Sequence, residues 1–305
     1  MPGRLLDQQV LLLLSVLPHL TSEKKFALKG GTAINFFLRD MPRLSVDIDL
    51  TYLPIEDRTA SLAAIGTSLE TIAEKISTSL PDVQIQREED RTSKWIRALL
   101  VQREGATIKV EPNLVLRGNV FPCQEQDLCE SAQKRFAAFV TANRLSVEDL
   151  YGGKICAALD RQHPRDLFDV KILLENEGIT DRIRKAFVVY LAGHDRPIHE
   201  LIEPTRQDVR AIFERDFVGM TMTAVKYQDL IDARETLVSE IQKGLTSQER
   251  RFLLSLKEGK PEWKLLGLAG IEKLPAIQWK LLNIRKMDKR KNAQMIGKLR
   301  RVLDL

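Results

Sequence analysis

The chain has 305 residues, of which 44% are hydrophobic and 29% are charged, with 47 Lys and Arg against 42 Asp and Glu. This composition is typical of a folded protein with a buried core, and it argues against disordered, collagen-like and low-complexity proteins. The three cysteines, Cys123, Cys129 and Cys156, form no Cys-x-x-Cys pair. An odd number at wide spacing argues against a disulfide framework and favours a reducing cytoplasm as the location.

The first predicted element is a leucine-rich helix over residues 5–20 that ends near Pro18. Its apolar stretch, residues 10–17, is too short to span a bilayer. No small-residue cleavage site follows it, so a secretory signal is not expected either. The pattern favours a buried helix and no membrane association.

A short apolar strand over residues 26–28 runs into Gly30-Gly31-Thr32, and a helix is expected over residues 33–38. Two glycines before a helix let the backbone approach a phosphate, and the helix start supplies free N–H donors. Thr32 would add a hydroxyl group. A Gly-Gly-Thr sequence alone is weak evidence for such a site.

Residues 44–53 alternate as a strand with one apolar and one polar face. The apolar face carries Val46, Ile48 and Leu50, and the polar face carries Ser45, Asp47, Asp49 and Thr51. Carboxylates at positions i and i+2 of a strand project from the same face. Asp47 and Asp49 are therefore candidate ligands for divalent cations, as in sites that clamp the oxygens of a phosphoryl transfer.

Residues 56–78 are predicted to form a helix, and residues 94–102 and 106–116 two strands joined by a turn at 103–105. A further short strand is predicted over residues 136–141. Glu111 shares the polar face of its strand with Lys109 and Asn113. We therefore regard Glu111 as the candidate third carboxylate of a metal site.

From Ser146 onward the pattern is helical, with Ser146 as a candidate N-cap and Pro164 in the first turn of the next helix. Beyond residue 180 it is almost wholly helical. The predicted fold is α/β (α+β): a mixed sheet with helices in a domain over residues 1–145, followed by an all-helical domain over residues 146–305.

The C-terminal region is basic, with ten Lys and Arg against one acid, Asp288, between residues 273 and 301. Such a patch binds a polyanion by releasing counterions from its phosphates, although many basic helices are simply solvated. The candidate nucleic-acid contacts are Lys280, Lys289, Arg290 and Lys291.

The order of these motifs resembles the nucleotidyltransferase superfamily of polymerase-β type. The matching segments are Leu28-Lys29-Gly30-Gly31-Thr32, Val46-Asp47-Ile48-Asp49-Leu50 and Val110-Glu111-Pro112. The resemblance implies that Asp47, Asp49 and Glu111 ligate Mg²⁺ or Mn²⁺, that an NTP is the substrate, and that Gly30, Gly31, Thr32 and Ser45 belong to the nucleotide site. Glu111 departs from the pattern, since aspartate is common there.

The chain more closely resembles the AbiEii/MenT branch, the toxin half of type IV toxin–antitoxin and phage-defence systems. Besides residues 29–33 and 43–50, the matching blocks are 149–161, 164–169, 249–253 and 274–283. The resemblance implies an essential lysine on the first helix of the second half, where Lys154 stands, and an essential aspartate on the next.

Lys154 is expected to contact the β- and γ-phosphates as a point charge, with Arg161 on the same helical face. The aspartate is Asp166 or Asp169, with Asp166 preferred, because Asp169 is also spaced to pair with Arg165. His163, between the two helices, is a weaker candidate for a phosphate contact.

The family resemblance implies transfer of NMP to an acceptor such as the 3′ end of tRNA, which inhibits translation and growth. It also implies a separately encoded antitoxin, often a winged-helix regulator that forms no lasting complex. Two alternatives remain open at this point: a small-molecule nucleotidyltransferase of the antibiotic-modifying sort, and an NTP-binding regulator or nucleic-acid-binding protein with an idle site.

Overall fold

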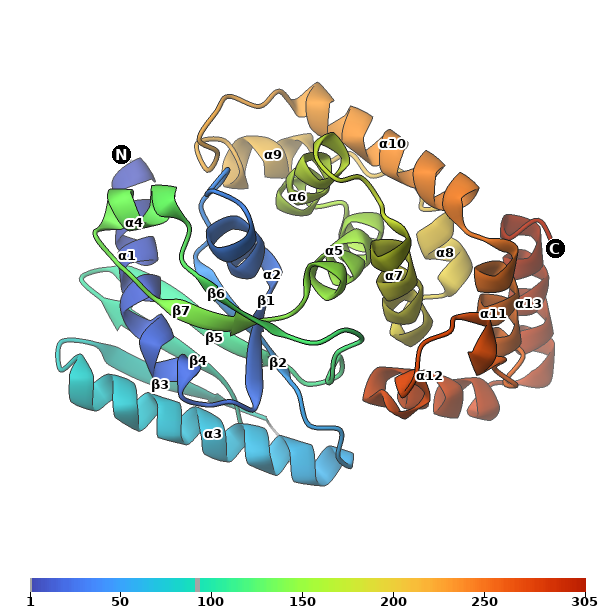
Figure 1. Cartoon of the computed structure of the whole chain (residues 1–305), viewed down its shortest axis with the longest axis horizontal. Coiled ribbons are helices and arrows are strands. Elements are labelled where there is room, and N and C mark those ends of the chain that lie inside the picture. Colours follow the sequence, from blue (N-terminus) through green and yellow to red (C-terminus); the bar gives the residue numbers. More distant parts are fainter. Residues whose placement is uncertain (1, 91–93) are drawn as a thin grey trace. The chain divides into compact units, whose positions relative to one another are not determined.

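The computed structural model describes residues 2–90 and 94–305, and it divides into two compact units (Figure 1). The first unit comprises the described residues up to and including Ser146, together with the separate segment Val218–Ala224. The second unit comprises Val147–Phe217 and Val225–Leu305. A mixed sheet lies in the first unit and helices make up the second, so the predicted α/β class is confirmed.

Within the described residues of the first unit, seven strands form one sheet in the order β3-β4-β5-β2-β1-β7-β6. The strands are β1 Phe26–Lys29, β2 Asp47–Tyr52, β3 Gln84–Glu89, β4 Ile96–Arg103, β5 Ala106–Asn113, β6 Gln124–Asp127 and β7 Thr141–Arg144. The helical segments are α1 Pro2–Thr21, α2 Gly30–Thr32, η1 Ala33–Leu38 (a π-helix), α3 Arg58–Ser79 and α4 Glu130–Phe136. The central strand β2 runs antiparallel to β1 and parallel to β5, while α3 packs on β4 and α1 packs on β5 and β7.

The strand predicted over residues 44–53 is shorter than expected and begins only at Asp47. Leu44 instead donates its N–H to the carbonyl of Met220, at 2.8 Å. The assignment of Thr51 to a solvent-facing polar face was wrong, because Thr51 is buried. Ile48 and Leu50 are buried as predicted.

Two further expectations for the first unit were wrong, and two strands were missed. Helix α1 continues through Pro18 to Thr21. Residues 136–141 are not a strand: α4 ends at Phe136, Ala137 takes a left-handed conformation (φ 48°), and β7 begins at Thr141. Strands β3 and β6 were not predicted, because these outer strands are polar and mostly exposed and show little hydrophobic alternation.

The second unit is helical throughout its regular elements. They are α5 Val147–Arg161, α6 Pro164–Glu175, α7 Asp181–Gly193, α8 Ile198–Ile202, α9 Arg210–Asp216, α10 Tyr227–Gly244, α11 Ser247–Lys257, η2 Trp263–Leu265, η3 Ile271–Lys273, α12 Pro275–Lys286 and α13 Lys289–Val302. Pro164 occupies the first turn of α6, as predicted, and the preceding His163 caps that helix by accepting a hydrogen bond at Nδ1 from the N–H of Arg165 (3.1 Å). Among the described residues, no helix is both long and apolar enough to cross a membrane.

Helices α5 and α7 pack with their backbones close together at Gly152. A Cβ atom at Gly152 would lie 2.9 Å from the backbone carbon of Ala186 in α7. The absence of a side chain at Gly152 therefore permits this approach. This close packing holds α5, which carries Lys154, against the core of the second unit.

The segment Val218–Ala224 returns to the first unit although it lies far along the chain. Thr221 forms a β-bridge with Arg43, and Met222 donates its N–H to the carbonyl of Pro42, at 2.9 Å. These bonds pair the backbone just before β2. The sequence pattern did not indicate this segment's place, because the pairing joins residues nearly 180 positions apart.

Candidate active site

The glycine turn and the acidic strand lie directly against each other. In the antiparallel pair of β1 and β2, Lys29 is the register partner of Asp49. The next residue, Gly30, has φ +71°, and a Cβ atom at that position would lie only 2.3 Å from Oδ2 of Asp49. Only glycine fits here without moving the carboxylate, since it tolerates positive φ and has no side chain.

The two residues after Gly30 connect the turn to the segment that leads into β2. A Cβ atom at Gly31 would lie 2.7 Å from Nη2 of Arg43 and 2.9 Å from Oγ of Ser45. The hydroxyl of Thr32 lies 2.6 Å from the carbonyl oxygen of Asp47 and 3.0 Å from Oγ of Ser45. Thr32 is fully buried, so its hydroxyl positions the strand instead of presenting itself to a phosphate.

A lysine that we did not assign to the site accompanies Glu111 on β5. In the parallel pair of β2 and β5, Asp49 is opposite Glu111 and Asp47 is opposite Lys109. Nζ of Lys109 lies 3.0 Å from Glu111 and 3.4 Å from Glu88. Partial burial lowers the pKa of Lys109, but the two carboxylates raise it more, so the net shift is upward. The placement of Lys109 two residues before Glu111, on the same face, was the sequence signal for this pair.

The carboxylates fit a divalent cation held partly by its substrate. Among residues 2–90 and 94–305, no three His, Cys, Asp or Glu side chains are grouped so as to hold a metal ion. Magnesium, however, commonly takes only one or two protein carboxylates and completes its shell with phosphates and water. Asp47 and Asp49, on one face of β2, suit that mode, whereas Glu111 as a further ligand stays a prediction.

The second unit contains a buried cluster of one lysine and two aspartates. Nζ of Lys154 in α5 lies 2.8 Å from Asp166 and 2.9 Å from Asp169, both in α6. The Lys154 side chain is 8% exposed and both aspartates are buried. Burial alone would raise the pKa of Asp166, but Lys154 and then Arg161 lower it well below its ordinary range.

Arg161 is the accessible cation of this cluster. Its Nε lies 2.5 Å from Asp166, yet its side chain is 64% exposed, so it presents positive charge at the surface of the second unit. Asp166 and Asp169 contact the same ammonium group, so the choice between them as the essential aspartate stays open. Lys154 already shares its charge with two carboxylates, and its role as a phosphate ligand stays a prediction.

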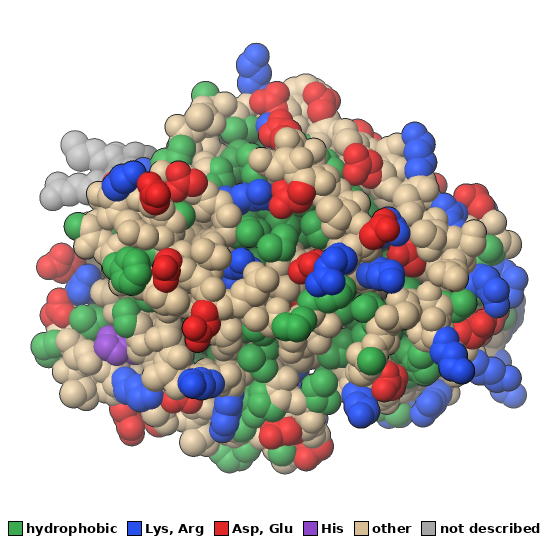
Figure 2. All heavy atoms as spheres, in the orientation of Figure 1, with side chains coloured by type: hydrophobic (Ala, Val, Ile, Leu, Met, Phe, Trp, Pro, Cys, Tyr) green, Lys and Arg blue, Asp and Glu red, His purple; other side chains and the backbone are tan. Residues whose placement is uncertain are grey.

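The four C-terminal candidates for nucleic-acid contacts divide into two kinds. Nζ of Lys280 donates to the backbone carbonyls of His194 and Arg196, at 2.7 and 2.8 Å, just past the end of α7. Lys289, Arg290 and Lys291, at the start of α13, are exposed. Figure 2 shows Lys and Arg side chains gathered on the side of the second unit that carries α12 and α13.

Comparison with known proteins identifies the class. The family model described as "Nucleotidyl transferase AbiEii toxin, Type IV TA system" matches residues 11–281. Among solved structures, the chain is similar to MenT4, a nucleotidyltransferase toxin from Mycobacterium tuberculosis H37Rv, with a TM-score of 0.63 and 16% sequence identity over 99% of this chain and 93% of that one. No curated protein matches the sequence.

The fold and the matched family define this chain as a nucleotidyltransferase enzyme. It belongs to the AbiEii family of nucleotidyltransferase toxins of type IV toxin–antitoxin systems. The predicted AbiEii/MenT resemblance is therefore confirmed.

Proposed function

We propose that this toxin transfers NMP from an NTP to the 3′ end of tRNA, in a reaction that depends on Mg²⁺ or Mn²⁺, and thereby stops translation and growth. The observation that supports this most directly is the contact between the Gly30 turn and the Asp49 carboxylate. It brings a backbone suited to phosphate next to an acid suited to a cation. The exposed basic residues of α13 support a polyanionic acceptor.

Each group has a defined part in the proposed reaction. The backbone of Gly30 and Gly31 lies against the triphosphate, and Asp47 and Asp49, with Glu111 as a further ligand, are the residues that would hold the cation. When bound, the cation neutralises phosphate charge and lowers the pKa of the acceptor hydroxyl. The acceptor oxygen forms a bond to the α-phosphorus, the bond to the pyrophosphate oxygen breaks, and the hydroxyl proton leaves to solvent.

Lys154 and Arg161 have a proposed part in phosphate binding. Arg161, oriented by Asp166, and Lys154, oriented by Asp166 and Asp169, would neutralise the β- and γ-phosphates. We place the reaction in the cytoplasm, where NTPs and tRNA meet. A separately encoded antitoxin, of winged-helix type, would restrain the toxin without a lasting complex.

The test is transfer of label to RNA. The protein is incubated with total RNA and each α-³²P-labelled NTP in turn, and labelled bands are resolved on a gel. Asp49→Asn should reduce transfer to tRNA by about 10³-fold or more, equivalent to about 4 kcal/mol of transition-state stabilisation. Asp82→Asn, an exposed carboxylate outside the site, is the matched control and should retain full activity.

The same assay separates the alternatives. Undiminished labelling by Asp49→Asn would disprove the site assignment. Pyrophosphate release that does not depend on RNA would instead favour a small-molecule acceptor, and no release with any RNA or NTP would favour an idle, regulatory site. Thermal melts of both variants show whether each is folded.

A further inference from the structure

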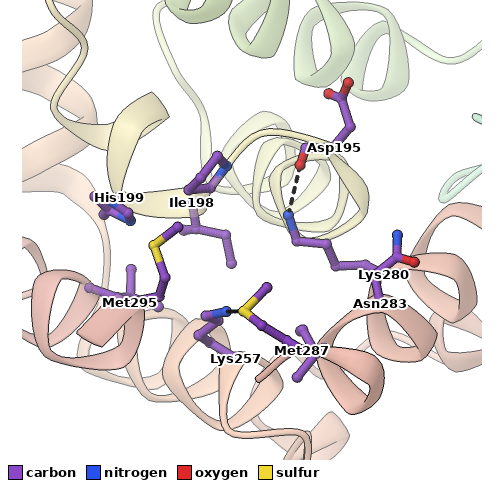
Figure 3. Close-up of a pocket in the computed structure, with 11 residues that line it drawn as sticks. Asp195, Ile198, His199, Lys257, Lys280, Asn283, Met287 and Met295 are labelled. Carbon is purple, nitrogen blue, oxygen red and sulfur yellow. Dashed lines mark hydrogen bonds between the residues drawn. The ribbon is translucent and has the colours of Figure 1, made fainter. Parts of the chain in front are cut away.

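A small pocket lies within the second unit, lined by α8, α11, α12 and α13 (Figure 3). Its walls include the apolar side chains Ile198, Ile284, Met287, Met295 and Leu299, and its polar groups come from Asp195, His199, Lys257, Lys280 and Asn283. Its volume is about 100 Å³. A water molecule needs about 10–15 Å³ of such space, so the pocket has room for several waters or for a small tetrahedral oxyanion.

One lysine of this pocket is buried without an anionic partner. Lys257, the last residue of α11, is only 9% exposed. Its Nζ contacts the sulfur of Met287 at 3.6 Å, and no carboxylate among the described residues lies within 4 Å of it. The neighbouring Glu258 pairs with Arg300 instead. An ammonium group with only a thioether for a partner is costly to bury, so an anion in the pocket would relieve that cost.

The opposite wall adds a second lysine. Lys280 donates to backbone carbonyls of residues 194–196, and burial, followed by the charge of Lys257, lowers its pKa to about 8. Figure 3 shows its ammonium directed at the backbone oxygen of Asp195, whose carboxylate points away. That carboxylate is 87% exposed and lies 3.0 Å from Nδ1 of His194.

The charges around the pocket are also mainly positive. Burial is the main cause that lowers the pKa of Lys257 and of His199. Lys291 lowers the pKa of Lys257 further, and Lys298 and Arg301 do the same for His199. Glu200 acts in the opposite direction on both His199 and Lys280. A site with one buried and one half-buried ammonium group and several basic neighbours favours a doubly charged anion over a single carboxylate.

We propose that this pocket is a phosphate-binding site, in which Lys257 and Asn283 contact the phosphate oxygens and the basic start of α13 draws the anion in. The phosphate belongs to RNA or is free in solution. The RNA source rests on the proposed function, whereas phosphate binding itself does not. The pocket residues belong to the second unit, whereas Asp47 and Asp49 belong to the first.

The test uses the full-length protein without NTP. Thermal unfolding is followed as sodium phosphate replaces sodium chloride at constant ionic strength and pH 7. Wild type should show a saturable rise in Tm, from which a Kd follows. Lys257→Met, which keeps the length of the side chain and removes its charge, should weaken phosphate binding at least about tenfold. Lys260→Met, an exposed lysine outside the pocket, should match wild type.

A second variant keeps the test valid if Lys257→Met does not fold. Asn283 is exposed, so Asn283→Asp should fold, and its carboxylate should abolish the phosphate response by occupying the ammonium groups. Gln294→Glu, an exposed residue of α13, is its charge-matched control. An unchanged phosphate response in both pocket variants, or no response in wild type, would overturn the proposal.

To find the source of the phosphate, we would measure how tightly wild type and Lys257→Met bind a fluorescent single-stranded RNA without terminal phosphates. If RNA supplies the phosphate, Lys257→Met should weaken RNA binding about tenfold and inorganic phosphate should compete. If RNA binding is unchanged in Lys257→Met while the phosphate response is lost, the ligand is free phosphate, which also supports the site. Neither assay contains NTP. A negative result here would therefore overturn only the phosphate site, and the label-transfer assay would still test the proposed function separately.

Discussion

At the scale of single residues, the proposed nucleotide site depends on the absence of a side chain at Gly30. Gly30 combines a positive φ with the closest approach to Asp49, and Gly31 leaves room for Arg43 and Ser45. The carboxylate can therefore lie directly against the turn. A misplacement of about 1 Å in such a site costs about 10²-fold in rate.

Substituting Gly30 with Ala should therefore lower NMP transfer about 100-fold, because the new Cβ displaces Oδ2 of Asp49. The positive φ adds backbone strain of about 1–2 kcal/mol, visible in thermal unfolding. Gly105→Ala is the matched control: its φ is +81°, but a Cβ atom there would have no atom within 4 Å. It should show similar strain and unchanged activity, and equal activities in the two variants would count against the contact between turn and carboxylate.

At the scale of elements, α5 and α6 are joined by a buried charge cluster whose strength depends on pH. Lys154 and Arg161 keep the folded pKa of Asp166 below its unfolded value of about 3.9. This stabilisation is thus fully present above about pH 4 and is lost as the pH falls through the folded pKa. The two helices should separate from each other more readily in acid.

We expect Asp166→Asn to destabilise the protein by about 3–5 kcal/mol at pH 7, because it weakens a buried ion pair and leaves Lys154 with Asp169 alone. Below about pH 4 the difference from wild type should shrink. Chemical denaturation at several pH values measures both effects. Asp181→Asn, an exposed partner of Arg184, should change little at any pH, and a pH-independent loss in Asp166→Asn would contradict the linkage.

Most elements with a buried face were predictable from the sequence, and elements without one were not. The alternation of Ile48 and Leu50 located β2, and three-to-four spacing located α3, whereas the polar edge strands β3 and β6 gave no comparable signal. Spacing likewise identified Asp47 and Asp49 as neighbours. It could not show that Thr32 is buried or that Asp49 lies opposite Glu111, because the first depends on how the chain packs and the second on which strands pair.

At the scale of the whole molecule, the charge is unevenly distributed, and the net excess of +5 is concentrated toward the C-terminus. The exposed residues Arg285, Lys286, Lys289, Arg290, Lys291, Lys298, Arg300 and Arg301 make α12 and α13 a basic surface. Such a surface contributes affinity for a polyanion that falls as salt rises.

Replacing Lys289, Arg290 and Lys291 together with Ala should weaken binding of single-stranded RNA uniformly across sequences. The slope of log K against log salt should become shallower by about 2, for three contacts at about 0.7 each. Fluorescence anisotropy over a range of salt concentrations measures it. Ala at the exposed Lys24, Lys25 and Lys243 removes the same charge elsewhere and should leave the slope nearly unchanged, and identical slopes for the two triple variants would rule out a local RNA surface.

The segment Val218–Ala224, which forms one β-bridge within the first unit, affects how this toxin folds during synthesis. Its carbonyl at Met220 and its bridge at Thr221 are partners of Leu44 and Arg43, just ahead of the acidic strand. A growing polypeptide leaves the ribosome from its N-terminus, so the first unit lacks these partners until residue 224 has emerged. A nascent chain released before that point, or a fragment ending at Ser146, would contain every candidate metal ligand. It would lack the backbone groups of Met220 and Thr221 that pair with the segment just before β2.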